Sequence, residues 1–377
     1  MSEVDELLQK DSKTIMRSII QRIATGPEMS KDISQEEARA GMRAVLDSAV
    51  DPVQAAVFLI ALRMKRETDE ENRGILDAIR DASSSVTAPV DEVLDLSDPY
   101  NGYNRTLPAA PFLPAVLAAC GVPTISHGVE TMSPKFGITH RRVLRAAGAP
   151  VELSVEQAAA RLGESGIGWS YVDQDAYCPQ LHDLSTLRTS IIKRQAITTV
   201  EVLTGPVRGR SKTHFMSGYV HKPYTRVYTM LARHAGFDSA LLVRGVEGGV
   251  TPSLRQKGRV VYYHDRGEEQ AGEFDPADIG IEQQVRATPL PDDLPARPSD
   301  DDVGADFDVA VAAEMAAQAG IAALEGTQGS SYDALVYSGA LALWHLKKYE
   351  NLRDAAQRIR EVLDNGEALG HFNNARA

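Results

Sequence analysis

Apolar residues recur at helical spacing through the first part of the chain. Residues 34–37 (SQEE) and 68–71 (TDEE) have the spacing of helix capping boxes, and apolar positions follow each at intervals of three and four. Between them, Asp51-Pro52 opens the strongly apolar stretch VQAAVFLIALRMK. This pattern predicts a small all-helical N-terminal domain over residues 1–88.

From residue 89 onward, short β-rich runs alternate with helical runs. The strand candidates are EVLDLS, VPTISH, GWSYVD, THFMSGYV, SALLVRG and RVVYYHD. Alternation of this kind predicts a mostly parallel central sheet flanked by helices. We therefore expect an α/β protein whose larger α/β domain spans residues 89–377, with a Pro- and Asp-rich excursion at about 287–308.

Composition narrows the setting of the protein. No run of about 18 apolar residues is present, so no membrane span is expected. The first residues, MSEVDELLQKDSK, are charged and lack the apolar core of a signal peptide. Cys120 and Cys178 are the only cysteines, and two scattered cysteines predict a cytoplasmic protein without a disulfide framework.

Charge is divided unevenly along the chain, although the formal net charge is −12. Residues 188–259 hold thirteen Lys/Arg against three Asp/Glu, whereas residues 265–308 hold three Arg against fourteen Asp/Glu. Such segregation predicts a basic working surface beside a solvated acidic segment. The alternative is that both stretches are ordinary solvated faces.

Polar side chains gather in two loops within residues 100–137, which follow the first two strand candidates. Neighbouring parallel strands end at the same edge of a sheet, where α/β proteins bind ligands. Because Glu130 is the one carboxylate of this stretch, the expected ligand is an anion. The predicted ligand residues are Asn101, Gly102, Arg105, His127, Gly128, Thr131 and Lys135. The structural alternatives are a salt-bridged arginine, a hydrogen-bonded core histidine and a solvated loop lysine.

Several segments, taken in order, resemble the anthranilate phosphoribosyltransferase family (glycosyltransferase family 3), which shares its fold with pyrimidine nucleoside phosphorylases. They are FLIALRMKRET, GVPTISHG, VLTGPV, SALLVRGVEGG and the closing GALALWHLKKYENLRDAAQRIREVLDNGEAL. The resemblance implies that a segment near 179–200 returns to the helical domain. It also implies a homodimer, for which the apolar stretch 52–64 could supply the contact.

The active-site signatures of that family are absent. Its glycine-rich pyrophosphate turn is replaced by residues 98–102 (DPYNG), and its acidic pair for magnesium by Val250-Thr251. Proline donates no amide and a diphosphate-bound Mg²⁺ needs carboxylate oxygens. Hence no metal site and no cofactor are predicted, phosphoribosyl pyrophosphate with Mg²⁺ included. Anthranilate phosphoribosyltransferase activity itself is not expected, and no catalytic residue is assigned.

The departures resemble the divergent YbiB-like branch of the family. The matching patterns are YxGxxRxLP at residues 100–108 and LR-x₅-R at 187–194. Members of that branch are understood to bind nucleic acid through a basic surface. The resemblance implies Arg188 as a further cleft residue. The polyanion surface would comprise Lys193, Arg194, Arg208, Arg210 and Lys212.

Two functions therefore follow from the sequence. The first is a binding protein for nucleic acid, single-stranded in the first instance, or for another phosphate-rich polyanion. The alternative is a glycosyl (pentosyl or phosphoribosyl) transferase acting on a small phosphorylated or nucleoside-like ligand in the cleft between the domains.

Overall fold

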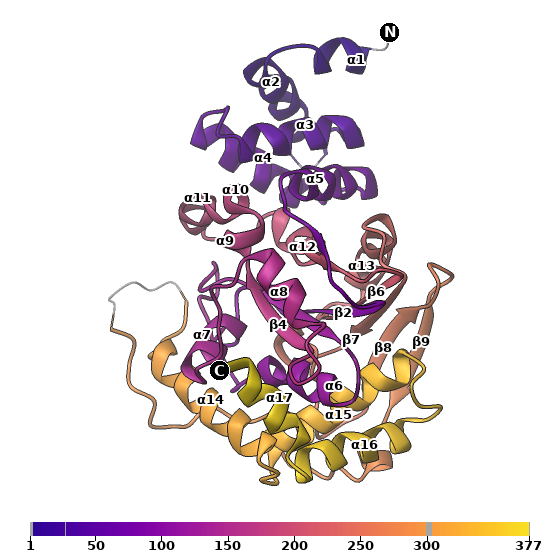
Figure 1. The fold of residues 1–377 in the computed structure, drawn as a ribbon. Helices are drawn as coiled ribbons and strands as arrows, with labels where there is room; N and C mark the ends of the chain where they lie inside the picture. Colours follow the sequence, from indigo (N-terminus) through magenta and orange to yellow (C-terminus); the bar gives the residue numbers. More distant parts are fainter. Residues whose placement is uncertain (1–2, 27, 299–303, 377) are drawn as a thin grey trace.

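The computed structural model describes residues 3–26, 28–298 and 304–376. A helical part lies at one end of the molecule, and a larger α/β part carries the central sheet (Figure 1). This arrangement confirms the fold class predicted from the sequence.

The helical part begins with five helices. They are α1 (Glu3–Leu8), α2 (Ser12–Ile23), α3 (Gln35–Leu46), α4 (Pro52–Lys65) and α5 (Asp69–Asp81). Both expected capping boxes form, because the hydroxyls of Ser34 and Thr68 accept from the backbone amides of Glu37 and Glu71 while those carboxylates accept in return. Helices α3 and α5 pack closely at Gly74, where an added Cβ would lie 2.2 Å from the Gln35 carbonyl oxygen.

Seven strands of the described residues form the main sheet, in the order β4-β3-β2-β6-β7-β8-β9. Their bounds are β2 Glu92–Ser97, β3 Thr124–Gly128, β4 Trp169–Asp173, β6 Lys212–Gly218, β7 Ser239–Val243, β8 Gly258–Tyr263 and β9 Gln270–Phe274. The first five strands in that spatial order are parallel, whereas β8 and β9 are antiparallel to their neighbours. A small parallel pair, β1 (Val86–Thr87) with β5 (Val207–Arg208), lies apart from it.

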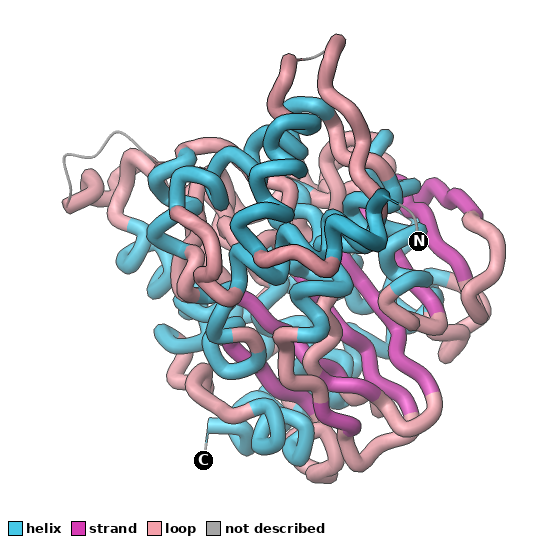
Figure 2. Tube along the Cα trace, turned by 90° about the horizontal axis from the view of Figure 1, so that it is seen from above, coloured by secondary structure: helices cyan, strands magenta, loops and turns pink. Residues whose placement is uncertain are grey.

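Helices cover both faces of the sheet and form two apolar cores. One core lies under α6 (Leu113–Ala119), α7 (His140–Ala146) and the C-terminal helices. Those are α14 (Val309–Leu324), α15 (Ser330–His345), α16 (Leu352–Asp364) and α17 (Glu367–Arg376). The other core lies under α8 (Val155–Arg161) and α13 (Pro223–His234) and continues without interruption into the helical part. Seen from the helical end, the bundle lies over part of the sheet (Figure 2).

Four short helices connect the two parts. They are α9 (Gln174–Tyr177), α10 (Pro179–His182), α11 (Ser185–Ile191) and α12 (Ile197–Val200). Helix α11 packs against α4, and α12 packs against α5. An ion pair from Arg226 to Asp69 (2.6 Å) and a hydrogen bond between His234 and Asp77 (2.6 Å) also tie α13 to α5. The exact domain boundaries stay predictions.

The Pro- and Asp-rich excursion forms neither helix nor strand over its described residues, and residues 299–303 of it lie outside them. An isolated bridge from Thr106 to Pro289 holds it to the loop after β2, and a second bridge joins its own residues Ala296 and Phe307. Within the described ranges, no helix has the length and apolar character needed to cross a membrane. The cytoplasmic location stays a prediction.

Candidate functional site

A cavity of about 380 Å³ lies where the helical part meets the carboxyl ends of the parallel strands. Its walls include the loops that follow β2, β3, β6 and β7, together with α4 and the segment around α12. The chain runs outward from β2 to β3 and β4, and then returns to the other side of β2 to build β6 and β7. The cavity therefore lies at the switch point of the sheet, where open α/β sheets bind ligands.

Aromatic and apolar side chains supply much of the cavity wall. Tyr100 comes from the loop after β2, Tyr219 from the loop after β6, and Tyr224 and Tyr228 from α13. Met132, Val202 and Val220 add apolar surface. Such walls suit a ring with two flat faces.

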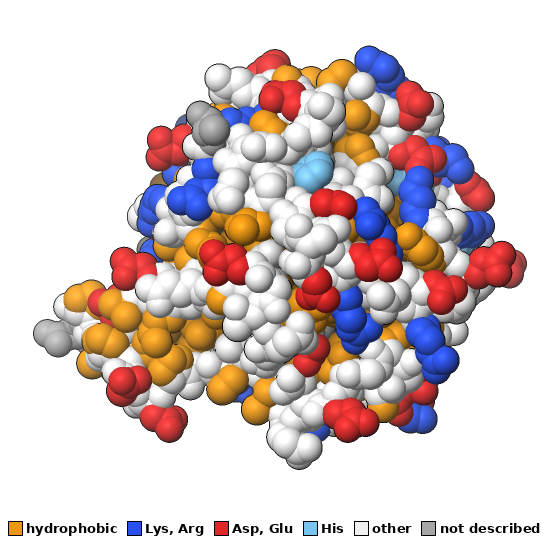
Figure 3. All heavy atoms as spheres, turned by 60° about the horizontal axis from the view of Figure 1, so that its bottom comes forward, with side chains coloured by type: hydrophobic (Ala, Val, Ile, Leu, Met, Phe, Trp, Pro, Cys, Tyr) orange, Lys and Arg blue, Asp and Glu red, His pale blue; other side chains and the backbone are white. Residues whose placement is uncertain are grey.

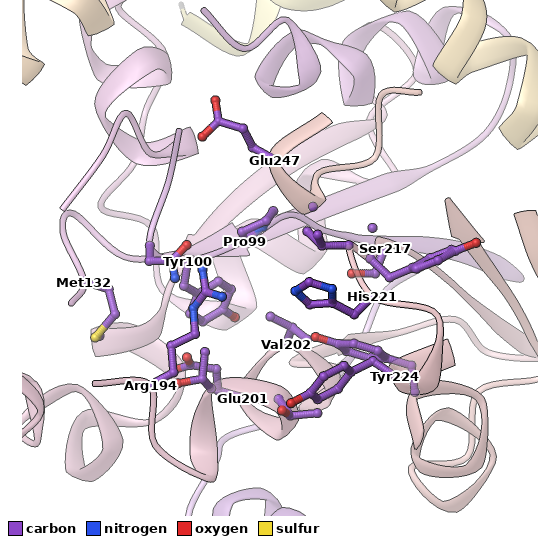
Figure 4. A pocket seen from close by; sticks show the side chains of 18 of the residues that line it. Pro99, Tyr100, Met132, Arg194, Glu201, Val202, Ser217, His221, Tyr224 and Glu247 are labelled. Carbon is purple, nitrogen blue, oxygen red and sulfur yellow. The ribbon is translucent and has the colours of Figure 1, made fainter. Parts of the chain in front are cut away.

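Two arginine side chains line this cavity, and they differ in whether they have hydrogen-bond partners in the protein. Arg63 of α4 is committed to the protein, because it donates to Tyr224 (2.8 Å), Thr199 (3.0 Å) and the Gln195 carbonyl (3.0 Å). Arg194, in the turn between α11 and α12, is exposed and forms no hydrogen bond or ion pair within the described residues. Arg194 and His221 extend toward the middle of the cavity (Figure 4). Arg194 is thus available to an anionic ligand.

Two buried oxygen atoms of cavity-lining residues also lack a partner among the described residues. They are Oδ1 of Asn101 and Oγ1 of Thr198. A buried acceptor without a hydrogen bond costs about 1–3 kcal/mol. A ligand that donates to these atoms would recover that cost.

His127 lies beneath the cavity instead of in it. Its Nε2 donates to the Asp95 carboxylate (2.9 Å), which leaves Nδ1 to accept from the Tyr100 hydroxyl. Tyr100 is bonded in turn to Tyr177 (2.6 Å). Burial, reinforced by Tyr177, raises the pKa of Tyr100 well above its ordinary value. The network therefore fixes Tyr100, which lies in the segment that replaces the glycine-rich turn of the family that the sequence resembles. His127 is a hydrogen-bonded core residue.

Two other predicted residues contact Glu247, which follows β7, and a third contacts one of these two. The Arg105 amide donates to its Oε1 (2.9 Å), Lys135 Nζ lies 3.4 Å from its Oε2, and Lys135 also donates to the Gly102 carbonyl (3.1 Å). Burial lowers the pKa of Lys135, although the Glu247 carboxylate opposes that shift. The loops after β2 and β3 therefore bring hydrogen-bond donors for an anion together, and the Glu247 carboxylate accepts from these donors.

The remaining predicted cleft residues lie elsewhere. Gly128 is buried against the Tyr171 ring, and Thr131 is exposed beside the cavity-lining Met132. Arg188 is fully buried and forms two bonds of 2.7 Å with Glu201. The resemblance implies Arg188 as a cleft residue, but its guanidinium is engaged by Glu201 and does not present an unpaired cation to the cleft.

The predicted polyanion residues do not form one surface. Lys193, Arg194 and Arg210 are exposed, whereas Arg208 stacks on Phe237 with 4.1 Å between its Cζ atom and the ring centroid. Burial lowers the pKa of Arg208 to about 10. Lys212 is paired with Asp265 at 3.0 Å. On the one face of the molecule that Figure 3 draws, Lys/Arg and Asp/Glu side chains are intermixed. Nucleic-acid binding stays a prediction.

The carboxylates near the cavity do not suit a diphosphate-bound magnesium ion. Glu201 is paired with Arg188, Glu247 is held by the two loops, and Asp98 accepts from Tyr103, His140 and the Val250 amide. Across residues 3–26, 28–298 and 304–376, no three His, Cys, Asp or Glu side chains are grouped to hold a metal ion. Since Mg²⁺ needs free carboxylate oxygens, the donor set does not fit it.

Residues 17–83 match the family described as "Glycosyl transferase family, helical bundle domain", and residues 101–288 match "Glycosyl transferase family, a/b domain". Among relatives, an anthranilate phosphoribosyltransferase of Rhodopseudomonas palustris is 25% identical over 93% of this chain and 95% of its own. An uncharacterized protein of Aquifex aeolicus is 30% identical over 59% of this chain and 65% of its own.

Solved structures of anthranilate phosphoribosyltransferases have the same fold. The Thermus thermophilus protein aligns with a TM-score of 0.72 and 20% identity, covering 96% of this chain and 98% of that chain. The Saccharomyces cerevisiae protein in complex with PRPP and Mg aligns with a TM-score of 0.72 and 14% identity, covering 96% and 97%.

Proposed function

Because the chain belongs to the glycosyl transferase family that joins a helical bundle to an α/β domain, we propose that it is a glycosyl transferase of the pentosyl or phosphoribosyl type. Its substrate would be a small phosphorylated or nucleoside-like molecule bound in the cavity between the two parts. The observation that carries this proposal is the cavity at the switch point of the sheet. Among its lining residues, one arginine and two oxygen atoms have no partner in the part of the chain that the structure describes.

The residues of the chain suggest how such a ligand would be held. Tyr219 and Tyr224 would flank a base or sugar ring, and Asn101 would accept a hydrogen bond from it. Arg194 would bind the anionic group. Breaking a glycosidic bond places negative charge on the leaving group, and a preorganised cation stabilises that charge. In this arrangement the Arg194 guanidinium would stabilise the charge on the leaving group, and no carboxylate-bound metal would be needed.

Relatives named anthranilate phosphoribosyltransferase guide the choice of test ligands. We would measure thermal unfolding with PRPP, with and without Mg²⁺, and with nucleosides in the presence of phosphate. A ligand that binds the folded state raises the unfolding temperature. Release of pyrophosphate or of free base would then report transfer.

The variant Arg194→Gln should weaken binding of an anionic ligand by roughly tenfold or more, because a charge-assisted hydrogen bond contributes about 1.5–3 kcal/mol. Binding of a neutral nucleoside should change little. Arg210→Gln, at an exposed arginine away from the cavity walls, is the matched control. Equal affinities for Arg194→Gln and wild type, or no stabilising ligand at all, would refute the proposal.

A further inference from the structure

Glu247 accepts from an unusually complete set of donors. The amides of Asn104 (3.0 Å) and Arg105 (2.9 Å), the Thr106 hydroxyl (3.0 Å) and the Lys135 ammonium (3.4 Å) all point at its carboxylate. Two successive backbone amides beside a hydroxyl and a lysine form a concave site of the kind that binds phosphate oxygens. The Glu247 carboxylate thus occupies a position built for an oxyanion.

The backbone at Glu247 is in a conformation that non-glycine residues rarely adopt. Its φ is +55° and its ψ is 11°, in the left-handed region, within the sequence Gly245-Val246-Glu247-Gly248-Gly249. A residue held there costs of order 1–3 kcal/mol unless the surroundings compensate. The four donors to its carboxylate offset part of that cost.

The charge around this position favours a second anion. Arg194 and Arg105 add to the positive potential at Lys135, and the Glu247 carboxylate opposes it. Glu247 also lines the cavity described above, while its carboxylate points away from the other labelled side chains (Figure 4). Rotation about the side-chain bonds of Glu247 would therefore free the donors without moving the loop that carries it.

We propose that Asn104, Arg105, Thr106 and Lys135 form a binding site for the phosphate group of a ligand, and that Glu247 occupies this site until the phosphate displaces it. The exchange involves no covalent step, since one anion leaves the donors and another takes its place. The inference rests on the proposed function for the identity of the whole ligand, because Glu247 also lines the cavity. It does not require that the protein catalyse any reaction.

The test is calorimetric binding of inorganic phosphate and of metal-free pyrophosphate. Glu247→Ala should bind pyrophosphate at least tenfold more tightly than wild type, because the competing carboxylate is gone. Glu361→Ala removes an equal charge from an exposed position of α16 and should bind like wild type. Adding Lys135→Met to Glu247→Ala should abolish the gain. A ribose 5-phosphate titration distinguishes a free phosphate from one carried on a sugar.

Glu247→Ala leaves two amides without an acceptor, so Glu247→Gln provides a second variant that keeps the side-chain shape. Its pyrophosphate affinity should also rise, and pyrophosphate should raise the unfolding temperature of both variants more than that of wild type. If neither variant binds pyrophosphate more tightly than Glu361→Ala, the donors serve only to hold the loop and the inference is wrong. Inactivity of the cavity toward every transfer substrate would refute the proposed function but leave this result standing.

Discussion

At the scale of single residues, side chains of the same type have different roles that depend on their hydrogen-bond and ion-pair partners. Arg188 and Arg194 both come from one basic stretch, but Arg188 is enclosed with Glu201 while Arg194 has no partner within the described residues. No periodicity links residue 188 to residue 201, so the pairing of Arg188 could not be read from spacing. The sequence places His127 at the end of a strand and Lys135 in the loop that follows it, whereas their partners are Asp95 of β2 and Glu247 in the segment after β7.

The Arg188–Glu201 pair offers a test of this distinction. Arg188→Ala should destabilise the fold by about 3–5 kcal/mol, because it leaves Glu201 buried without its counterion. Arg188→Met combined with Glu201→Leu should recover much of the loss, since neither charge is then buried alone. Chemical unfolding of both variants measures the difference. Arg210→Ala is the exposed control and should unfold like wild type; an equal effect at Arg188 would contradict the pairing.

At the scale of elements, apolar patterning was a reliable guide to the parallel strands. The six strand candidates correspond to β2, β3, β4, β6, β7 and β8. Strand β9 was missed because its sequence, QAGEF, is polar and its residues are exposed or half-buried at the sheet edge. The direction of β8 could not be predicted from the sequence, because alternation of strands with helices predicts parallel neighbours. In the structure, β8 is antiparallel to both β7 and β9.

Contact between helices makes a sharper prediction at this scale. Gly74→Ala should destabilise the protein by about 1–3 kcal/mol, because the new methyl group would meet the Gln35 carbonyl and the Ala38 side chain of α3. Gly370→Ala, in α17 with no atom within 4 Å of an added Cβ, should instead stabilise by up to about 1 kcal/mol through helix propensity. Thermal unfolding of the two variants should shift in opposite directions. Shifts of the same sign would mean that α3 and α5 are not packed this closely.

At the scale of the whole molecule, the cavity joins segments that are remote in sequence. Arg63 comes from α4, Arg194 from the turn after α11 and Tyr224 from α13. A sequence pattern places each of these residues on its own element. Whether they lie close together depends on how the helical part packs on the sheet. For that reason the loops after β2 and β3 were predicted as a site, whereas the helical wall of the cavity was not.

The distribution of charge over the molecule predicts weak binding to nucleic acid. Of the basic stretch, Arg188 is buried, Arg208 is half-buried and Lys212 is paired with Asp265. We expect little change in anisotropy of a labelled single-stranded oligonucleotide at moderate salt. The YbiB-like interpretation predicts binding with an association constant that falls steeply as salt rises, on a plot of its logarithm against the logarithm of salt concentration. A steep slope that flattens in Lys193→Gln/Arg194→Gln/Arg210→Gln would favour that interpretation over ours.

The uninterrupted core between the helical part and the sheet also has a consequence for biosynthesis. Leu181, Ile197 and Val200 share one apolar cluster with Leu59 and Ile79 of the N-terminal helices. During translation those first helices leave the ribosome long before the segment that covers them, and β2, β3 and β4 are made in between. The N-terminal helices therefore emerge with part of their apolar surface uncovered, and the bundle becomes complete only after half of the chain has been synthesised.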